Sequence, residues 1–124
     1  MIPRAAATIA LLRDGESGPE VLMMRRTHLA EFASGVYVFP GGAVDAADSD
    51  PALATLARGM DDAQASRALG MIEGGLAYWV AAIRECCEEA GLLLAYDGGG
   101  GYHRDRGRFG QCQVRRAAAR ALTR

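Results

Sequence analysis

One run of nine residues, 84–92, concentrates the side chains most able to do chemistry in this chain. It reads R-E-C-C-E-E-A-G-L and places three carboxylates within five residues. Apolar residues recur at positions 76, 80, 83, 87 and 90, which is helical spacing. We therefore predict a helix from about residue 76 that ends at Gly91, a residue type common just past a helix C-terminus. Glu85, Glu88 and Glu89 then lie together on the opposite side of that helix.

Three acids in the last turn of a helix need a compensating positive charge. The C-terminal end of the helix dipole disfavours a carboxylate by about 0.3–1 kcal/mol, and the acids also repel one another. A hard divalent cation bound by oxygen ligands offsets both effects. An E-x-x-E-E cluster alone is more often a solvated helix face. Here Arg84 precedes the acids, Gly91 follows them and an F-P-G-G run stands upstream at 39–42, so the cluster is part of a longer pattern that can be compared with known motifs.

Composition narrows the class of protein. The 124 residues suffice for one small domain with a core, and half of them are hydrophobic. The cysteines at 86, 87 and 112 form no disulfide framework, which indicates a reducing compartment and a cytoplasmic protein. Cys86 and Cys87 lie among acids at a helix C-terminus, which raises a thiol pKa and argues against a nucleophilic cysteine. No apolar run approaches the roughly 20 residues of a membrane span.

Turn and capping signals divide the chain into short elements. The pattern predicts three strands, a buried one at 8–13 and two more at 20–26 and 36–39. A turn at 14–19 separates the first two, and a loop at 27–35 separates the last two. Pro40-Gly41-Gly42 is expected to end the third strand. Asp50-Pro51 and Asp61 are helix-start signals, and Gly59 and Gly70 end the two helices. A further strand is predicted at 92–96, and Tyr78 and Trp79 are expected in or near the core.

The glycine-rich run and the acidic run together resemble the Nudix hydrolase box. That box is G-x5-E-x7-R-E-U-x-E-E-x-G-U, in which U is a bulky apolar residue. Residues 84–92 match its second half at every fixed position, with Cys86 in the first U slot. Gly42 matches the first half, and Asp48 stands six residues later, where the box has Glu. The spacer from Asp48 to Arg84 is 35 residues instead of 7, so 28 extra residues interrupt the box.

Interrupted boxes occur in a Nudix subgroup that resembles the peroxisomal coenzyme A diphosphatases. Loop length costs little free energy, so a helical insertion at about 49–75 is compatible with an intact site. The coenzyme A signature of these enzymes reads L-L-T-x-R-S-x3-R-x3-G-x3-F-P-G-G. Its spacing is kept by Leu22, Arg26, Gly35 and the run 39–42. The departures from it are Met23, Met24 and Thr27, and Glu31 in place of the second Arg.

The resemblance implies an α/β fold, a Nudix-type α/β/α sandwich with a mixed sheet, over residues 1–96 and incomplete at its C-terminus. It implies metal-dependent hydrolysis of a nucleoside diphosphate linked to another moiety, such as coenzyme A or its esters. The implied ligands of Mg²⁺ or Mn²⁺ are the Gly41 carbonyl and the side chains of Glu85, Glu88 and Glu89. Arg84 would pair with a site carboxylate and orient it, and Glu88 or Glu89 is the candidate general base. The candidate substrate contacts are Arg26 and Gly42.

Residues 97–124 differ in character from the rest of the chain. They hold 7 Arg and 2 acids, whereas residues 1–96 hold 7 Arg and 13 acids. We expect this Gly/Arg-rich tail to be disordered or non-native, through truncation or a shifted reading frame. Two alternatives to an active enzyme stay open: an inactive Nudix fragment, and a non-enzymatic binding module that uses the tail. The expected partner is a small nucleotide diphosphate rather than a membrane or nucleic acid, and a homodimer is left open.

Overall fold

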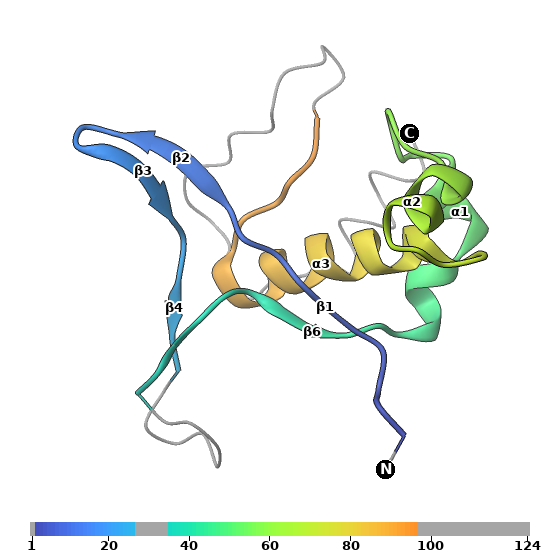
Figure 1. The fold of residues 1–124 in the computed structure, drawn as a ribbon, viewed down its shortest axis with the longest axis horizontal. Coiled ribbons are helices and arrows are strands. Elements are labelled where there is room, and N and C mark those ends of the chain that lie inside the picture. The colour runs from blue at the N-terminus through green and yellow to red at the C-terminus, as the bar shows by residue number, and fades with distance from the viewer. Residues whose placement is uncertain (1, 27–34, 97–124) are drawn as a thin grey trace.

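The structure, a computed structural model, describes residues 2–26 and 35–96 of the chain. Its longest element is helix α3, Gly75–Ala90, which is the acidic helix predicted from the sequence (Figure 1). Gly91 ends this helix with φ at 67° and donates its N–H to the carbonyl of Cys87 at 3.0 Å. Glycine adopts this left-handed conformation without the strain that a Cβ atom would cause. The predicted end of the helix is therefore confirmed.

Helix α3 packs on its neighbours mainly through small side chains. Its buried residues are Gly75, Leu76, Ala77, Ala81, Ala82, Cys86 and Cys87. The predicted apolar row is thus only partly right, because positions 80, 83 and 90 are half-buried. Trp79 is 43% exposed, so its prediction as a core residue is wrong, and Tyr78 is half-buried. Small side chains occupy the buried face because they allow neighbouring backbones to approach the helix closely.

Three extended segments of the chain supply the strands, and each segment contains two of them. Their bounds are β1 Ala6–Thr8, β2 Leu12–Gly15, β3 Gly18–Val21, β4 Met24–Arg25, β5 Tyr37–Val38 and β6 Gly41–Ala43. In the described residues β1 pairs with β6, β2 with β3 and β4 with β5, all antiparallel. Each segment therefore pairs with both of the others in turn. Figure 1 shows β1 and β6 running alongside α3, while the β2–β3 hairpin extends away from it.

Each extended segment pairs with one neighbour in its first half and with another in its second half. This change of partner divides it into two short strands, and the strand predictions are partly wrong for that reason. The single buried strand expected at 8–13 is replaced by β1 and β2, which have no buried residue, and Leu12 is 70% exposed. The strand expected at 20–26 likewise divides into β3 and β4. The hairpin itself is confirmed, but its turn has two residues rather than six, because Asp14 pairs with Pro19 and Gly15 with Gly18.

Two further expectations about strands need correction. The strand expected at 36–39 is the shorter β5, and Pro40-Gly41-Gly42 does not end the pairing, because β6 begins at Gly41. Residues 92–95 form no regular strand, and Tyr96 makes a single bridge. The predicted loop with Glu31 falls on 27–34, which lies outside the described residues, as do the calls on residues 97–124.

The 3-10 helix η1, Ala46–Ser49, leads into the inserted segment, which contains helices α1, Pro51–Ala54, and α2, Asp62–Ala68. Asp50 caps α1 by accepting the N–H of Ala52 at 2.9 Å. Asp61 begins α2 in a reciprocal capping box with Gln64. Both predicted helix starts are confirmed. Helix α2 stops close to Gly70, where φ is 68°, but α1 is shorter than predicted and ends well before Gly59.

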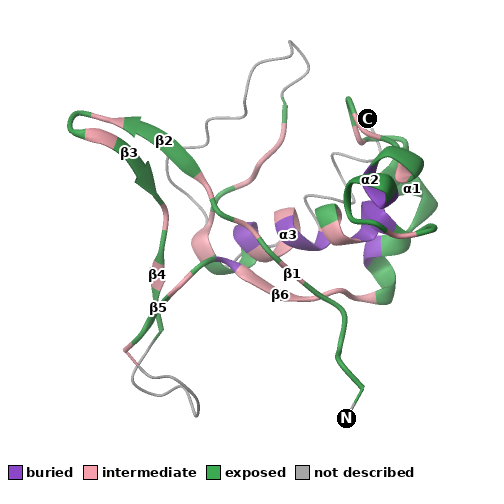
Figure 2. Ribbon diagram, in the orientation of Figure 1, coloured by how far each residue is buried: buried purple, intermediate pink, exposed green. Residues whose placement is uncertain are grey.

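The buried residues gather along α3 and where α2 meets it. Figure 2 shows buried positions on these two helices and an exposed β2–β3 hairpin. The buried polar residues of the described part are Asp48 and Ser66. Each of them lies against α3: Asp48 contacts Arg84, and Ser66 contacts Gly75. Across residues 2–26 and 35–96, no helix combines the length and apolar character required to cross a bilayer.

Candidate functional site

Arg84 is the centre of a dense polar cluster at the middle of α3. Its Nε and Nη2 donate to the two carboxylate oxygens of Asp48 at 2.9 and 3.0 Å, a bidentate ion pair. Its Nη1 donates to Glu85 at 2.8 Å and to Glu88 at 3.1 Å. Its Nη2 also donates to the carbonyl of Ala43, in β6, at 2.9 Å. All five guanidinium N–H groups therefore have an acceptor.

The side chain of Arg84 is largely shielded from water, with 16% of its surface exposed. The hydrogen bonds that Arg84 donates to Asp48, and next the one that it donates to Glu85, raise the pKa of Arg84 above its already high ordinary value, although burial opposes the shift. Arg84 is therefore a permanent cation in the folded protein. It brings one formal positive charge to three contacting carboxylates, so the cluster keeps an excess of negative charge.

Asp48 joins the inserted segment to the helix. It lies in η1, and its side chain is 2% exposed. Besides the pair with Arg84, its Oδ2 accepts the N–H of Asp45 at 2.8 Å, which closes the turn that carries it. From the sequence, Asp48 stands at the acidic position of the first half of the box, and the structure brings it into direct contact with the second half. The pair of Asp48 and Arg84 thus brings together the two ends of the 35-residue spacer.

Glu89 makes the second contact between α3 and β6. Its Oε2 accepts the backbone N–H of Gly41 at 3.0 Å. The N–H of Ile9 donates to Pro40 and that of Val44 to Ala5, so these pairs are the hydrogen-bonded positions of the β1–β6 ladder. Because such positions alternate along antiparallel strands, Gly41 and Ala43 point their N–H and C=O groups away from β1. The carbonyl of Ala43 reaches Arg84, so the carbonyl of Gly41 is turned toward the same side.

Both glycines of the P-G-G run lie where a side chain would collide. A Cβ added to Gly42 would stand 2.5 Å from the Cδ of Glu85, so the Glu85 carboxylate lies directly against this backbone. A Cβ added to Gly41 would stand 2.5 Å from the carbonyl oxygen of Ala7 in β1. Gly41 is therefore needed for the strand pairing, and Gly42 for the close approach of an acidic side chain of α3.

The three glutamates of α3 offer oxygen donors, which suit Mg²⁺ and Mn²⁺. In the arrangement described here, one oxygen of each glutamate accepts an N–H group, from Arg84 or from Gly41. No three acidic, histidine or cysteine side chains among the described residues are arranged as a preformed metal cage. The second oxygen of each glutamate makes no hydrogen bond within the described part. The donor chemistry thus fits a hard cation, and the carboxylates would turn toward it from N–H donors.

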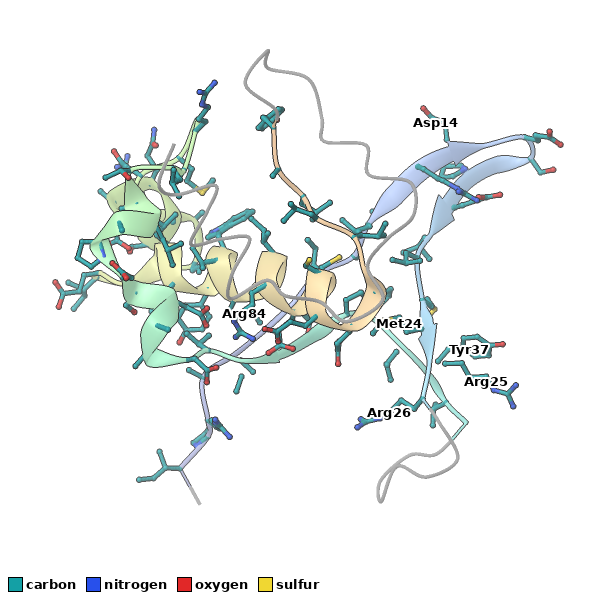
Figure 3. All side chains as sticks on the ribbon, turned by 180° about the vertical axis from the view of Figure 1, so that it is seen from behind. Asp14, Met24, Arg25, Arg26, Tyr37 and Arg84 are labelled. Carbon is teal, nitrogen blue, oxygen red and sulfur yellow. The ribbon has the colours of Figure 1, made fainter. Side chains whose placement is uncertain are left out.

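Arg26 lies apart from this cluster. It is exposed and sits at the end of the β4–β5 pairing, where its N–H donates to Val36 at 3.0 Å and its carbonyl accepts from Gly35 at 3.1 Å. Figure 3 shows Arg25 and Arg26 leaving the strand in opposite directions, as successive strand residues do. The structure therefore unites Arg84, the three glutamates, Gly41 and Gly42, but it does not bring Arg26 into contact with them.

The cysteines beside the glutamates are buried. Cys86 is 0% exposed, and burial raises the pKa of its thiol, with a further contribution from the charge of Glu89. The direction agrees with the sequence-based expectation. A protonated, buried thiol is a poor nucleophile, so Cys86 serves the packing of α3 against its neighbours.

Sequence reasoning did not identify two contacts of the cluster. The carbonyl of Ala43 accepts from Arg84, and the carboxylate of Asp45 lies 3.9 Å from the same guanidinium. A backbone acceptor leaves no signature in the type of its residue. The D-x-x-D spacing of Asp45 and Asp48 does indicate a capping box, which the structure contains at the start of η1.

Comparison with known proteins gives a match that concerns the fold. No protein-family model matches the chain. The fold is similar to a solved structure described as the NUDIX hydrolase from Alicyclobacillus acidocaldarius, with a TM-score of 0.63 and 31% sequence identity. The match covers 94% of this chain and 54% of the other, so this chain spans about half the length of that protein. The α/β fold expected from the sequence is therefore confirmed, and it is similar to the fold of that Nudix hydrolase.

Proposed function

We propose that the chain is a Nudix-type, metal-dependent hydrolase of a nucleoside diphosphate linked to another moiety. One observation carries this proposal: the two halves of an interrupted Nudix box meet in space. Arg84 joins Asp48 to Glu85 and Glu88, and Glu89 joins α3 to Gly41. If the motif were only a chance likeness in sequence, Asp48 and Arg84, which are 36 residues apart, would have no reason to be in contact.

In this proposal Glu85, Glu88 and Glu89, with the Gly41 carbonyl, hold Mg²⁺ or Mn²⁺. The bound cation would neutralise the charge of the substrate diphosphate and activate water for attack. The excess negative charge around Arg84 supports cation binding here. Arg84 is a positioning residue, because its donors hold Glu85 and Glu88 while its pair with Asp48 fixes the guanidinium.

Glu88 and Glu89 are the candidate general bases, and their surroundings differ. Glu88 is hydrogen-bonded to the guanidinium of Arg84, whereas Glu89 is hydrogen-bonded to a neutral backbone amide. Either carboxylate would accept a proton from water in reach of the cation. We keep both assignments in the proposal, and the comparison of variants in the Discussion separates them.

The proposed substrate is coenzyme A or one of its esters, a choice that rests on the spacing of Leu22, Arg26, Gly35 and the F-P-G-G run. The guanidinium of Arg26 is exposed and makes no ion pair within the described residues, so it is open to a substrate phosphate. Gly42, whose lack of a side chain lets the carboxylate of Glu85 lie directly against its backbone, stays the second candidate substrate contact. We place the enzyme in the cytoplasm, from its cysteine usage.

The test is an assay of the purified chain with coenzyme A and with ADP-ribose, each in Mg²⁺ or Mn²⁺. The expected result is release of adenosine 3′,5′-bisphosphate from coenzyme A or of AMP from ADP-ribose, detected by chromatography, that stops when EDTA is added. Full activity in EDTA, or no turnover of either substrate by a folded chain that binds Mn²⁺, would contradict the proposal.

Replacing Gly42 with alanine is expected to weaken Mn²⁺ binding, because the new Cβ displaces the carboxylate of Glu85. Changes in groups that hold a metal ligand in place typically cost about 10–100-fold in affinity. The matched control is Gly15→Ala, whose Cβ would meet the Glu20 side chain at 2.6 Å in the distant hairpin. Equal Mn²⁺ affinities for these two variants, measured by calorimetry, would show that the approach of Glu85 to Gly42 is irrelevant to the metal.

A second candidate is a module that binds metal without turning over substrate. It is favoured by the exposure of large apolar side chains on described elements: Leu12 is 70% exposed, Tyr37 61% and Tyr96 53%. Apolar surface of this kind is common at interaction sites. Binding of Mn²⁺ without hydrolysis in the assay above is the result that this candidate predicts.

A further inference from the structure

The start of α3 has no capping side chain of its own. Its N-cap is Gly74, with φ at 79°, and no side chain of that residue can accept a hydrogen bond. The first four N–H groups of any helix need acceptors from outside the helix. At the start of α3, the inserted helix α2 supplies acceptors for the N–H groups of Gly74, Gly75 and Leu76.

Two side chains of α2 accept three successive N–H groups of α3. Asp62 accepts the N–H of Gly74 at 3.0 Å through Oδ2 and that of Leu76 at 2.9 Å through Oδ1. The hydroxyl of Ser66, which is 1% exposed, accepts the N–H of Gly75 at 2.8 Å. The two backbone hydrogen bonds, from Leu76 and then Gly74, hold the pKa of Asp62 below its ordinary value. The folded state therefore stabilises the ionised form of Asp62 relative to the unfolded chain.

The two helices also touch backbone to backbone. A Cβ added to Gly75 would collide with the backbone of Ser66 and would stand 2.6 Å from the carbonyl carbon of Ala65. Ala65 and Ser66 are both buried. No side chain fits at position 75 in this arrangement, so α2 and the first turn of α3 are held at a fixed separation.

Helix α3 is held at a second point by the residue that immediately precedes the inserted segment. This residue is Asp48, which forms the bidentate pair with Arg84. Arg84 lies nine residues after Gly75, which is about 13.5 Å along a helix axis. Attachment at two separated points restricts both sliding along the axis and rotation about it, whereas one point would leave rotation freer. The glutamates follow Arg84 in the next turn, where Glu89 contacts Gly41 of β6.

We propose that the inserted segment is a brace for the metal-binding part of α3, in which Asp62 and Ser66 are positioning residues. They fix the first turn of α3 while Asp48 fixes Arg84. Together these contacts set where Glu85, Glu88 and Glu89 stand relative to β6. The role in metal binding rests on the proposed function, but the position of α3 against β6 can be tested without metal.

The experiment compares Asp62→Ala with Asp50→Ala. Both variants remove a carboxylate of the inserted segment that caps a helix. Asp50 caps α1, which belongs to the same segment, whereas Asp62 caps α3, which follows it. The first readout is the NMR resonance of the Gly41 amide in metal-free protein, because this N–H donates to Glu89 at the far end of α3. The second readout is Mn²⁺ affinity, measured at a temperature at which both variants are folded.

The brace predicts a shifted Gly41 resonance and Mn²⁺ affinity reduced by roughly tenfold in Asp62→Ala, and neither change in Asp50→Ala. Asp62→Asn, which keeps one acceptor oxygen, should lie between Asp62→Ala and the wild type. It also replaces Asp62→Ala if that variant does not fold, with Ser66→Ala as a further variant. A lower melting temperature with an unchanged Gly41 resonance and unchanged affinity would overturn the proposal, since Asp62 would then be a local cap. If the wild type binds no Mn²⁺, the proposed function fails, and the Gly41 resonance still decides on the brace.

Discussion

Replacing Arg84 with methionine is expected to lower the free energy of unfolding by roughly 3–5 kcal/mol, the usual cost of removing one partner from a buried ion pair. Methionine keeps much of the side-chain volume but donates no hydrogen bond. Asp48, with a side chain 2% exposed, would be left as a buried charge without its bidentate partner. Glu85 and Glu88 would also repel one another without the guanidinium between them. Urea denaturation followed by circular dichroism measures the change.

The control for this prediction is Arg13→Met. Arg13 also forms an ion pair, with Glu20 at 2.6 Å, but its side chain is 81% exposed. Exposed pairs contribute about 0–1 kcal/mol, so Arg13→Met should change stability little. The double variant Arg84→Met/Asp48→Asn should be more stable than Arg84→Met alone, because the unpaired charge is gone. Equal losses in Arg84→Met and Arg13→Met would show that Arg84 does not organise the cluster.

Replacing Glu88 or Glu89 with glutamine is expected to reduce metal-dependent hydrolysis by at least about 100-fold, the lower end of the effect of losing a general base. Glutamine has nearly the same shape, and its carbonyl oxygen can still accept from the Gly41 N–H that Glu89 now binds. The loss would therefore come from chemistry rather than from misfolding. The matched control is Glu16→Gln, the same change at an exposed position of the β2–β3 turn.

The two variants also distinguish a metal ligand from a general base. A variant that lacks a ligand should need more Mn²⁺ to reach its maximal rate, whereas a variant that lacks the base should keep its Mn²⁺ affinity and lose turnover. The assignment is made by measuring the rate against Mn²⁺ concentration for each variant. Wild-type rates in both variants would remove Glu88 and Glu89 from the proposed chemistry.

Local signals in the sequence predict where α1 and α2 begin and where α3 ends. Asp50 and Asp61 cap the helices that they were expected to begin, and Gly91 ends α3 in the left-handed conformation. These signals work because each depends on backbone groups only a few residues away. The resemblance also implied that Arg84 pairs with a site carboxylate, but it did not indicate which one, and the structure gives Asp48, Glu85 and Glu88.

Features that depend on distant partners were not predictable in the same way. The first extended segment changes partner between β1 and β2, and no pattern of apolar residues within 8–13 indicates where this occurs. The caps on α3 are supplied by Asp62 and Ser66, between 9 and 14 residues earlier in the chain. Gly74-Gly75 signals only that a helix can begin there. The acceptors for the first N–H groups of α3 depend on how closely α2 packs against it, which is a property of the tertiary structure.

The central claim is that the carboxylates of α3 form a divalent-cation site, and binding of Mn²⁺ tests it most directly. The signal of hydrated Mn²⁺ in electron paramagnetic resonance falls when the ion binds protein. The account predicts that the wild-type chain reduces this signal at micromolar to millimolar concentrations, and that a variant with Glu85, Glu88 and Glu89 all replaced by glutamine does not. Equal binding of Mn²⁺ by the wild type and by this triple variant would contradict the account.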